Sequence, residues 1–141
     1  MSDEARAAQG FENRQDIELA IRPEVWEAFS TLNAVTMLDN SLGLQTTMEV
    51  FTVASLAAGC RHCQSHGAYG LSQTGTDTER IRALWSFETS DLFSDADRAV
   101  LRFALAAGRS PSDVTPEHHR EMRAHFTDAQ TADALSVICV A

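Results

Sequence analysis

The stretch QTTMEVFTVASLAAGCRHCQSH, residues 45–66, decides the fold of this chain. From Gln45 to Ala58 apolar side chains recur at spacings of three and four residues, which is the period of an amphipathic helix. Gly59 is a poor residue for a helix interior, so the pattern predicts a break or kink there. A further helix should open directly after this glycine and continue to about Leu71. The stretch therefore predicts two consecutive helices joined at Gly59.

The same helical period recurs along most of the chain and predicts an all-α fold. Prolines and capping residues mark where the other helices begin and end, because proline favours the first helical turn and Ser or Thr favours the cap. They predict helices over 23–38, from 78, over 95–107, from 116 and from about 128. We expect a compact domain of about six to seven helices.

Length and charge restrict the class of protein. A chain of 141 residues fits one domain with a hydrophobic core, so we expect a single domain over residues 1–141, with 1–15 as a flexible N-terminal arm. A formal charge of −9 argues against nucleic acid or a membrane as a partner, since both recruit clusters of Lys and Arg. The first thirteen residues are polar and do not resemble a signal peptide, so we expect a cytoplasmic protein.

Residues 60–66 carry two thiols and two imidazoles and are the most reactive segment of the chain. Cys60 and Cys63 are three residues apart, so on a helix they share a face and a reversible local disulfide is feasible. Such a small loop adds little stability, which favours redox cycling over a structural role. His66 shares the face of Cys63, whereas His62 projects about 100° away on a straight helix. His66 is therefore the better candidate for proton transfer.

Glu49 is the nearest preceding carboxylate and lies eleven residues before Cys60. On an unbroken helix this separation is about 16 Å along the axis, which is too long for a hydrogen bond to the thiols. Only a chain reversal near Gly59 would bring the carboxylate close. It could then orient an imidazole as a proton acceptor.

The segment from Glu49 to His66 resembles the signature of alkylhydroperoxidase D-like proteins, which belong to the carboxymuconolactone decarboxylase superfamily. Residues 81–88 and 97–104 are more weakly similar. The resemblance implies an all-helical fold, assembly as a homo-oligomer and reduction of peroxides through a dithiol/disulfide cycle. It further implies that Cys63 attacks the peroxide and that Cys60 resolves the product.

The resemblance also implies that His66 and Glu49 form a proton relay, with His62 as the histidine that some members place between the cysteines. The spacing departs from the family pattern by one residue at two positions. The family glutamate stands twelve residues before the first cysteine and its histidine four after the second, and this chain has Met48 and Gly67 there.

These features together predict a thiol-dependent hydroperoxidase or disulfide reductase that uses no cofactor and no metal. Its partners would be a hydroperoxide and an external dithiol or thiol-redox protein as electron donor. One alternative is a structural or regulatory zinc site, in which Cys60, Cys63 and a histidine supply three ligands. The distant candidates for the fourth ligand are His118, His119, His125 and Cys139. A second alternative is a non-catalytic, redox-sensing oligomer. Cys139 lies in an apolar run, and we expect it to be buried.

Overall fold

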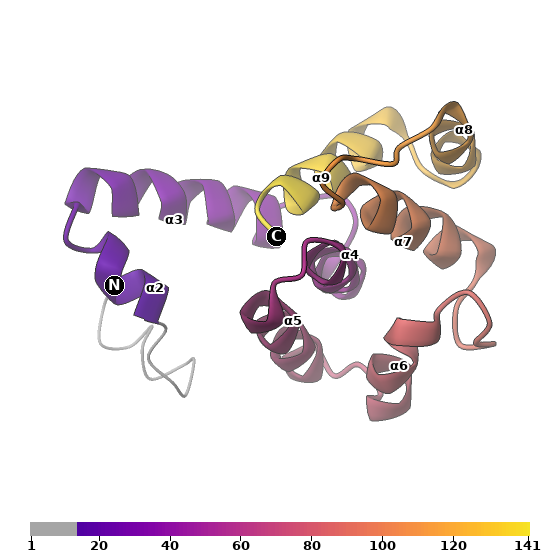
Figure 1. Cartoon of the computed structure of the whole chain (residues 1–141), viewed down its shortest axis with the longest axis horizontal. Helices are drawn as coiled ribbons and strands as arrows, with labels where there is room; N and C mark the ends of the chain where they lie inside the picture. The colour runs from indigo at the N-terminus through magenta and orange to yellow at the C-terminus, as the bar shows by residue number, and fades with distance from the viewer. Residues whose placement is uncertain (1–13) are drawn as a thin grey trace. The chain divides into compact units, whose positions relative to one another are not determined.

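The computed structural model describes residues 14–141 and is helical throughout (Figure 1). In this part of the chain there are eight α-helices and a 3-10 turn, with no strand, so the predicted all-α fold is confirmed. The chain divides into two compact units, residues 1–35 and 36–141. Residues 1–13 of the expected N-terminal arm lie outside the described part, and the single-domain expectation stays a prediction.

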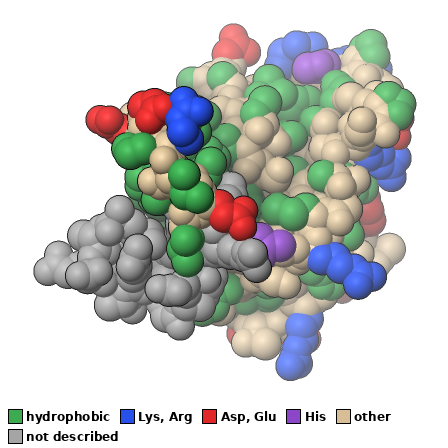
Figure 2. Space-filling view, turned by 60° about the vertical axis from the view of Figure 1, so that its left-hand side comes forward, with side chains coloured by type: hydrophobic (Ala, Val, Ile, Leu, Met, Phe, Trp, Pro, Cys, Tyr) green, Lys and Arg blue, Asp and Glu red, His purple; other side chains and the backbone are tan. Residues whose placement is uncertain are grey.

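The first unit contains α2 (Arg14–Leu19) and most of α3 (Pro23–Leu38). The predicted bounds of α3 are confirmed, and Pro23 occupies its first position, where a helix needs no backbone N–H. Trp26 and Phe29, the large aromatic residues of this helix, are only half-buried. Figure 2 shows apolar side chains among polar ones on the molecular surface, and on α3 the exposed ones include Val25, Leu32, Val35 and Leu38.

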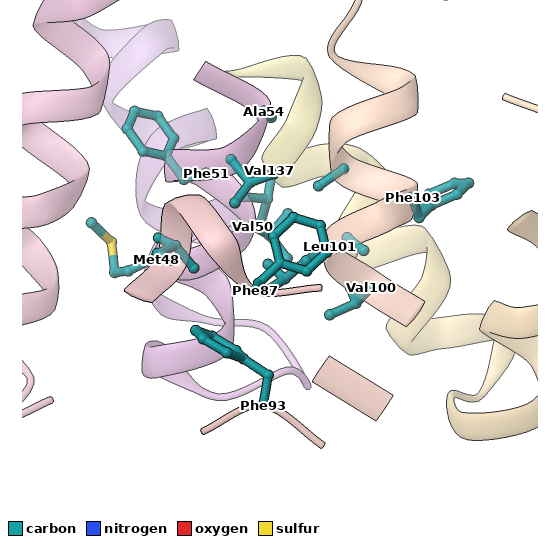
Figure 3. Packing of buried hydrophobic residues seen from close by; sticks show 14 of the residues in the cluster. Met48, Val50, Phe51, Ala54, Phe87, Phe93, Val100, Leu101, Phe103 and Val137 are labelled. Carbon is teal, nitrogen blue, oxygen red and sulfur yellow. The ribbon is translucent and has the colours of Figure 1, made fainter. Parts of the chain in front are cut away.

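In the second unit, α4 (Leu44–Ala57) is the central helix. It packs against α5 (Arg61–Gln73), α7 (Asp95–Ala107) and α9 (Asp128–Cys139) (Figure 1). All nine residues over 47–55 are buried, because neighbouring elements cover α4 on every side. Side chains from α4, α7 and α9 meet in one hydrophobic cluster (Figure 3), which includes Val50, Leu101 and Val137.

The remaining elements are α6 (Thr78–Ala83), the 3-10 turn Leu84–Ser86 and α8 (Pro116–His125). Ser94 begins α7 as predicted: its hydroxyl accepts the N–H of Asp97, and the Asp97 carboxylate accepts the N–H of Ser94. Thr127 and Gln130 cap α9 in the same way. These reciprocal pairs satisfy N–H groups that a helix leaves without partners, which explains why the sequence located the helix starts well.

Two glycines of α5 allow α4 to approach closely. A Cβ atom on Gly67 would lie 2.1 Å from Oγ1 of Thr52, and one on Gly70 would lie 2.1 Å from Cε of Met48. Thr52 is fully buried, and its hydroxyl donates to the Met48 carbonyl at 2.6 Å. Met48 offers only the flexible end of its side chain. The contact at Gly67 is therefore the rigid one.

We expect Gly67→Ala to destabilise the protein and Gly70→Ala to be close to neutral. Overpacking costs about 1–3 kcal/mol, while replacing glycine by alanine inside a helix returns about 1 kcal/mol at either position. The methyl group at position 70 displaces only the methionine terminus, so its packing cost should be small. Urea unfolding of the two variants tests the difference. Equal midpoints would show that Thr52 yields as readily as Met48.

Candidate active site

The joint between α4 and α5 reverses the chain and confirms the break predicted at Gly59. Gly59 has a φ of 75°, a left-handed conformation that other residues rarely adopt. Its N–H donates to the Leu56 carbonyl at 3.0 Å, and the N–H of Cys60 donates to the Ser55 carbonyl, also at 3.0 Å. These two bonds form a Schellman motif, which closes the end of α4. Arg61 is then the first residue of α5.

Cys60 is the N-cap of α5, and its Sγ accepts the N–H of Cys63 at 3.2 Å. The two cysteines form a disulfide, with their Cα atoms 5.3 Å apart. Both are half-buried. The local disulfide predicted from the spacing is therefore present, and it lies in the first turn of a helix, where N–H groups and the helix dipole favour negative charge on sulfur.

The two histidines lie one turn apart on α5, with ring centroids 6.5 Å from each other. His62 is exposed, whereas His66 is half-buried. The ring of His66 meets the edge of the Phe51 ring on α4, with centroids 6.3 Å apart. His66 thus lies on the side of α5 that faces α4. The first two turns of α5 bring together both thiols and both imidazoles.

Glu49 is turned toward α6. Its side chain is 2% exposed, and it accepts hydrogen bonds from Arg80 Nε at 2.7 Å and Nη2 at 3.0 Å. Gln45 donates a further bond at 3.1 Å. Met48, the preceding residue, instead contacts α5 at Gly70. One residue turns a helical side chain by about 100°, so the one-residue offset in the sequence gives the carboxylate a different partner. Its part in a proton relay stays a prediction.

Arg80 was missed by the sequence reasoning, although it connects several elements. Besides Glu49, it binds Asp97 at 3.3 Å and donates to the Leu92 carbonyl, and its guanidinium lies 4.3 Å from the centre of the Phe93 ring. The hydrogen bond with Glu49 raises the pKa of Arg80, and the nearby carboxylate charges add to this rise, while burial opposes it. No local pattern marks one arginine of a short polar helix as the partner of a carboxylate 31 residues earlier.

The zinc alternative finds no ligand cluster in residues 14–141, where no three His, Cys, Asp or Glu side chains are close enough to hold a metal ion. Two of the distant candidates have other contacts. Nδ1 of His118 accepts the N–H of Thr115 at 3.1 Å, and the His119 ring packs on the edge of Phe103, with centroids 5.5 Å apart. These histidines therefore stabilise α8 and its packing.

The expectation that Cys139 is buried is wrong, because its side chain is exposed. The buried face of α9 is formed by Ala134 and Val137. Cys139 follows Val137 by two residues, which rotates it about 200° around the helix and away from the core. An apolar run at a chain end did not reveal which of its members face outward.

None of the described helices is long and apolar enough to cross a membrane.

Removing the Arg80 side chain should lower the free energy of unfolding far more than removing that of a surface arginine. We expect Arg80→Met to cost about 3–5 kcal/mol, because Glu49 would be left buried without its counter-ion. The matched control is Arg102→Met, whose partner Glu88 is 46% exposed, and here we expect less than about 1 kcal/mol. Chemical denaturation measures both. Adding Glu49→Leu to Arg80→Met should recover much of the loss, and a failure to recover would contradict the charge argument.

Comparison with known proteins supports the fold. The sequence matches no protein-family model, and it has no significant match among curated proteins. Among solved structures, the apo debrominase Bmp8 is similar with a TM-score of 0.91 and 24% identity, over 96% of this chain and 73% of that one. A cysteine-to-alanine variant of Bmp8 in complex with 2,3,4-tribromopyrrole gives the same values.

Two further structures link the fold to the resemblance found in the sequence. An uncharacterized peroxidase-related protein from Silicibacter sp. TM1040 has a TM-score of 0.85 and 20% identity, over 98% of this chain and 73% of that one. A protein of unknown function from Agrobacterium tumefaciens, a candidate antioxidant defence protein AhpD, has a TM-score of 0.78 and 19% identity, over 86% and 84%. The chain therefore has the all-α fold of the alkylhydroperoxidase D-like structures.

Proposed function

We propose that the chain is a thiol-dependent oxidoreductase that reduces organic hydroperoxides, or disulfides, by cycling Cys60 and Cys63 between dithiol and disulfide. The observation that carries this proposal is the disulfide in the first turn of α5, with one imidazole in the same turn and a second in the next turn. A cross-link between residues three apart closes too small a loop to stabilise the fold much. A cross-link of this kind is better suited to storing and releasing two electrons.

The Cys63 thiolate would attack the terminal oxygen of the hydroperoxide and break the O–O bond. This step oxidises Cys63 to a sulfenic acid and releases an alkoxide, which takes a proton from His66 or His62. The Cys60 thiolate then attacks the sulfenic sulfur, and water leaves as the disulfide forms. In total, one hydroperoxide and two thiols give one alcohol, one water and one disulfide.

His66 is the stronger of the two proton donors in this scheme. It shares a face of α5 with Cys63, and its half-buried ring packs against Phe51. His62 is exposed and less constrained. Glu49, on α4, would be the carboxylate of the proton relay while it stays paired with Arg80. Recovery of the dithiol requires an external dithiol or thiol-redox protein, and a homo-oligomer in the cytoplasm is the expected setting.

A peroxide challenge tests the proposal in a Cys139→Ser background, which removes the exposed third thiol. Reduced protein with one equivalent of cumene hydroperoxide should form the Cys60–Cys63 disulfide, with the loss of two free thiols. Cys63→Ser should abolish the reaction. Cys60→Ser should stop it at a sulfenic acid that dimedone traps. His66→Asn should slow the reaction by roughly 10²-fold or more, as expected for a lost proton donor.

The exposed, surface-paired residue Arg109 supplies a control, since Arg109→Met should react at the unaltered rate. Thiols that remain free after the challenge would contradict peroxide reduction. If oxidised lipoamide still converts the dithiol to the disulfide, the protein is a disulfide reductase rather than a peroxidase.

Reductive debromination is a second candidate, favoured by the likeness to both Bmp8 structures. A Cys63 thiolate would attack a bromine of an electron-rich aromatic ring, and the ring carbon would take a proton as the C–Br bond breaks. Cys60 would then displace bromide from sulfur and form the disulfide. One bromoarene and two thiols thus give one arene, one HBr and one disulfide.

Reduced protein incubated with 2,3,4-tribromopyrrole should release one bromide for each disulfide formed if this second candidate holds. Ion chromatography of bromide and a free-thiol count measure both products. Bromide release without disulfide formation, or at the same rate in Cys63→Ser, would exclude it.

A further inference from the structure

We propose that Cys60 is the sulfur that the external dithiol attacks, so that electrons return to the pair through Cys60 while the substrate reacts at Cys63. The inference rests on the proposed function, because it assigns the reducing half of the same cycle. It divides the two sulfurs by their surroundings, which differ although both residues are half-buried.

Access favours Cys60. It lies at the corner between α4 and α5, and its chain neighbours Gly59 and Arg61 are both exposed, as is Ala58. A protein-borne thiol needs such a corner, because its own backbone must approach closely. Thiol–disulfide exchange depends strongly on which sulfur can be reached. An external thiol that approaches this corner therefore reaches Cys60 before Cys63.

Cys63 lies further inside. Its side chain packs against the hydrophobic cluster of the second unit. In the next turn, His66 contacts Phe51 and Gly67 lies against Thr52, so this side of α5 is closed by α4. A thiol carried by a peptide or a protein would find this sulfur hard to reach, whereas a small organic substrate could approach it.

The hydrogen bonds favour Cys60 for the second step as well. Its Sγ is positioned at the N-cap, where it accepts the N–H of Cys63 at 3.2 Å. A thiolate in this position is stabilised by that N–H and by the helix dipole. A thiol with a stabilised thiolate leaves faster from a disulfide. Cys60 is thus well suited to depart when the mixed disulfide is resolved. In the first step Cys63 is the leaving group, and there access, rather than leaving-group strength, directs the attack to Cys60.

Each of the two steps of reduction breaks one S–S bond and forms another. One donor thiolate attacks Sγ of Cys60, the Cys60–Cys63 bond breaks, and Cys63 leaves as a thiolate. The second donor thiolate then attacks the donor sulfur of the mixed disulfide, and Cys60 leaves as a thiolate. The donor becomes a disulfide, and its two protons pass to the cysteine thiolates. The net result is a reduced pair and an oxidised donor.

The chain offers a direct assay, because Arg61 separates the two cysteines and trypsin cleaves after arginine. Oxidised Cys139→Ser protein is mixed with excess glutathione, quenched with acid within milliseconds, blocked with N-ethylmaleimide and digested. We expect glutathione on the peptide that ends at Arg61 in roughly fivefold excess over the peptide that begins at His62, since access and the attacked sulfur control this rate.

A second measurement keeps the leaving-group argument testable. Two variants are prepared in the Cys139→Ser background. Cys63→Ser retains only the Cys60 thiol, and Cys60→Ser retains only the Cys63 thiol. Each is alkylated with iodoacetamide across pH 5–9. The Cys60 thiol should react with a midpoint below the usual value of about 8.5. Circular dichroism verifies that both variants are folded.

Glutathione found mainly on the peptide that begins at His62, or equally on both at the earliest time, would overturn the proposal. A midpoint for Cys60 at or above 8.5 would overturn the leaving-group step. Neither assay contains peroxide, so each stands or fails separately from the proposed function. A protein inert to peroxide could still exchange at Cys60, and an active peroxidase could prove to be reduced at Cys63.

Discussion

Burial of α4 on every side is the constraint on which the unit of residues 36–141 depends. Because α5, α7 and α9 cover this helix, its buried polar side chains cannot be hydrated and need partners within the protein. Thr52 and Ser55 donate to carbonyls one turn earlier in the same helix. Glu49, the only charged residue over 47–55, requires Arg80 from α6. This ion pair connects α6 to the buried part of α4.

The reactive residues lie where this buried helix ends. The Schellman motif closes α4, and Cys60, whose N–H donates the last hydrogen bond of that motif to the Ser55 carbonyl, also caps α5. Cys60 thus provides a hydrogen-bond partner both for a carbonyl at the end of α4 and for an N–H at the start of α5. The disulfide, the helix N-terminus and the imidazoles of α5 are brought together by backbone hydrogen bonds, which a short segment of sequence determines by itself.

Local patterns explain what could be predicted. The bounds of α3, the break at Gly59, the Ser94 cap and the feasibility of the Cys60–Cys63 bond all depend on residues within one or two turns of each other. The wrong or missing predictions depend on distant contacts. Cys139 is exposed because of how α9 packs, and nothing near Arg80 in the sequence indicates the carboxylate that it neutralises.

The placement of the disulfide at a helix joint has a consequence for native-state motion. Residues 47–55 of α4 are buried, so their amide hydrogens should exchange with solvent only when the whole unit unfolds. Ala58, Gly59 and Arg61 of the intervening turn are exposed, so this turn can open locally while the core stays intact. The disulfide thus joins a turn that can open locally to the first turn of a helix that packs against the core, and Cys63 connects the two through its contact with the hydrophobic cluster.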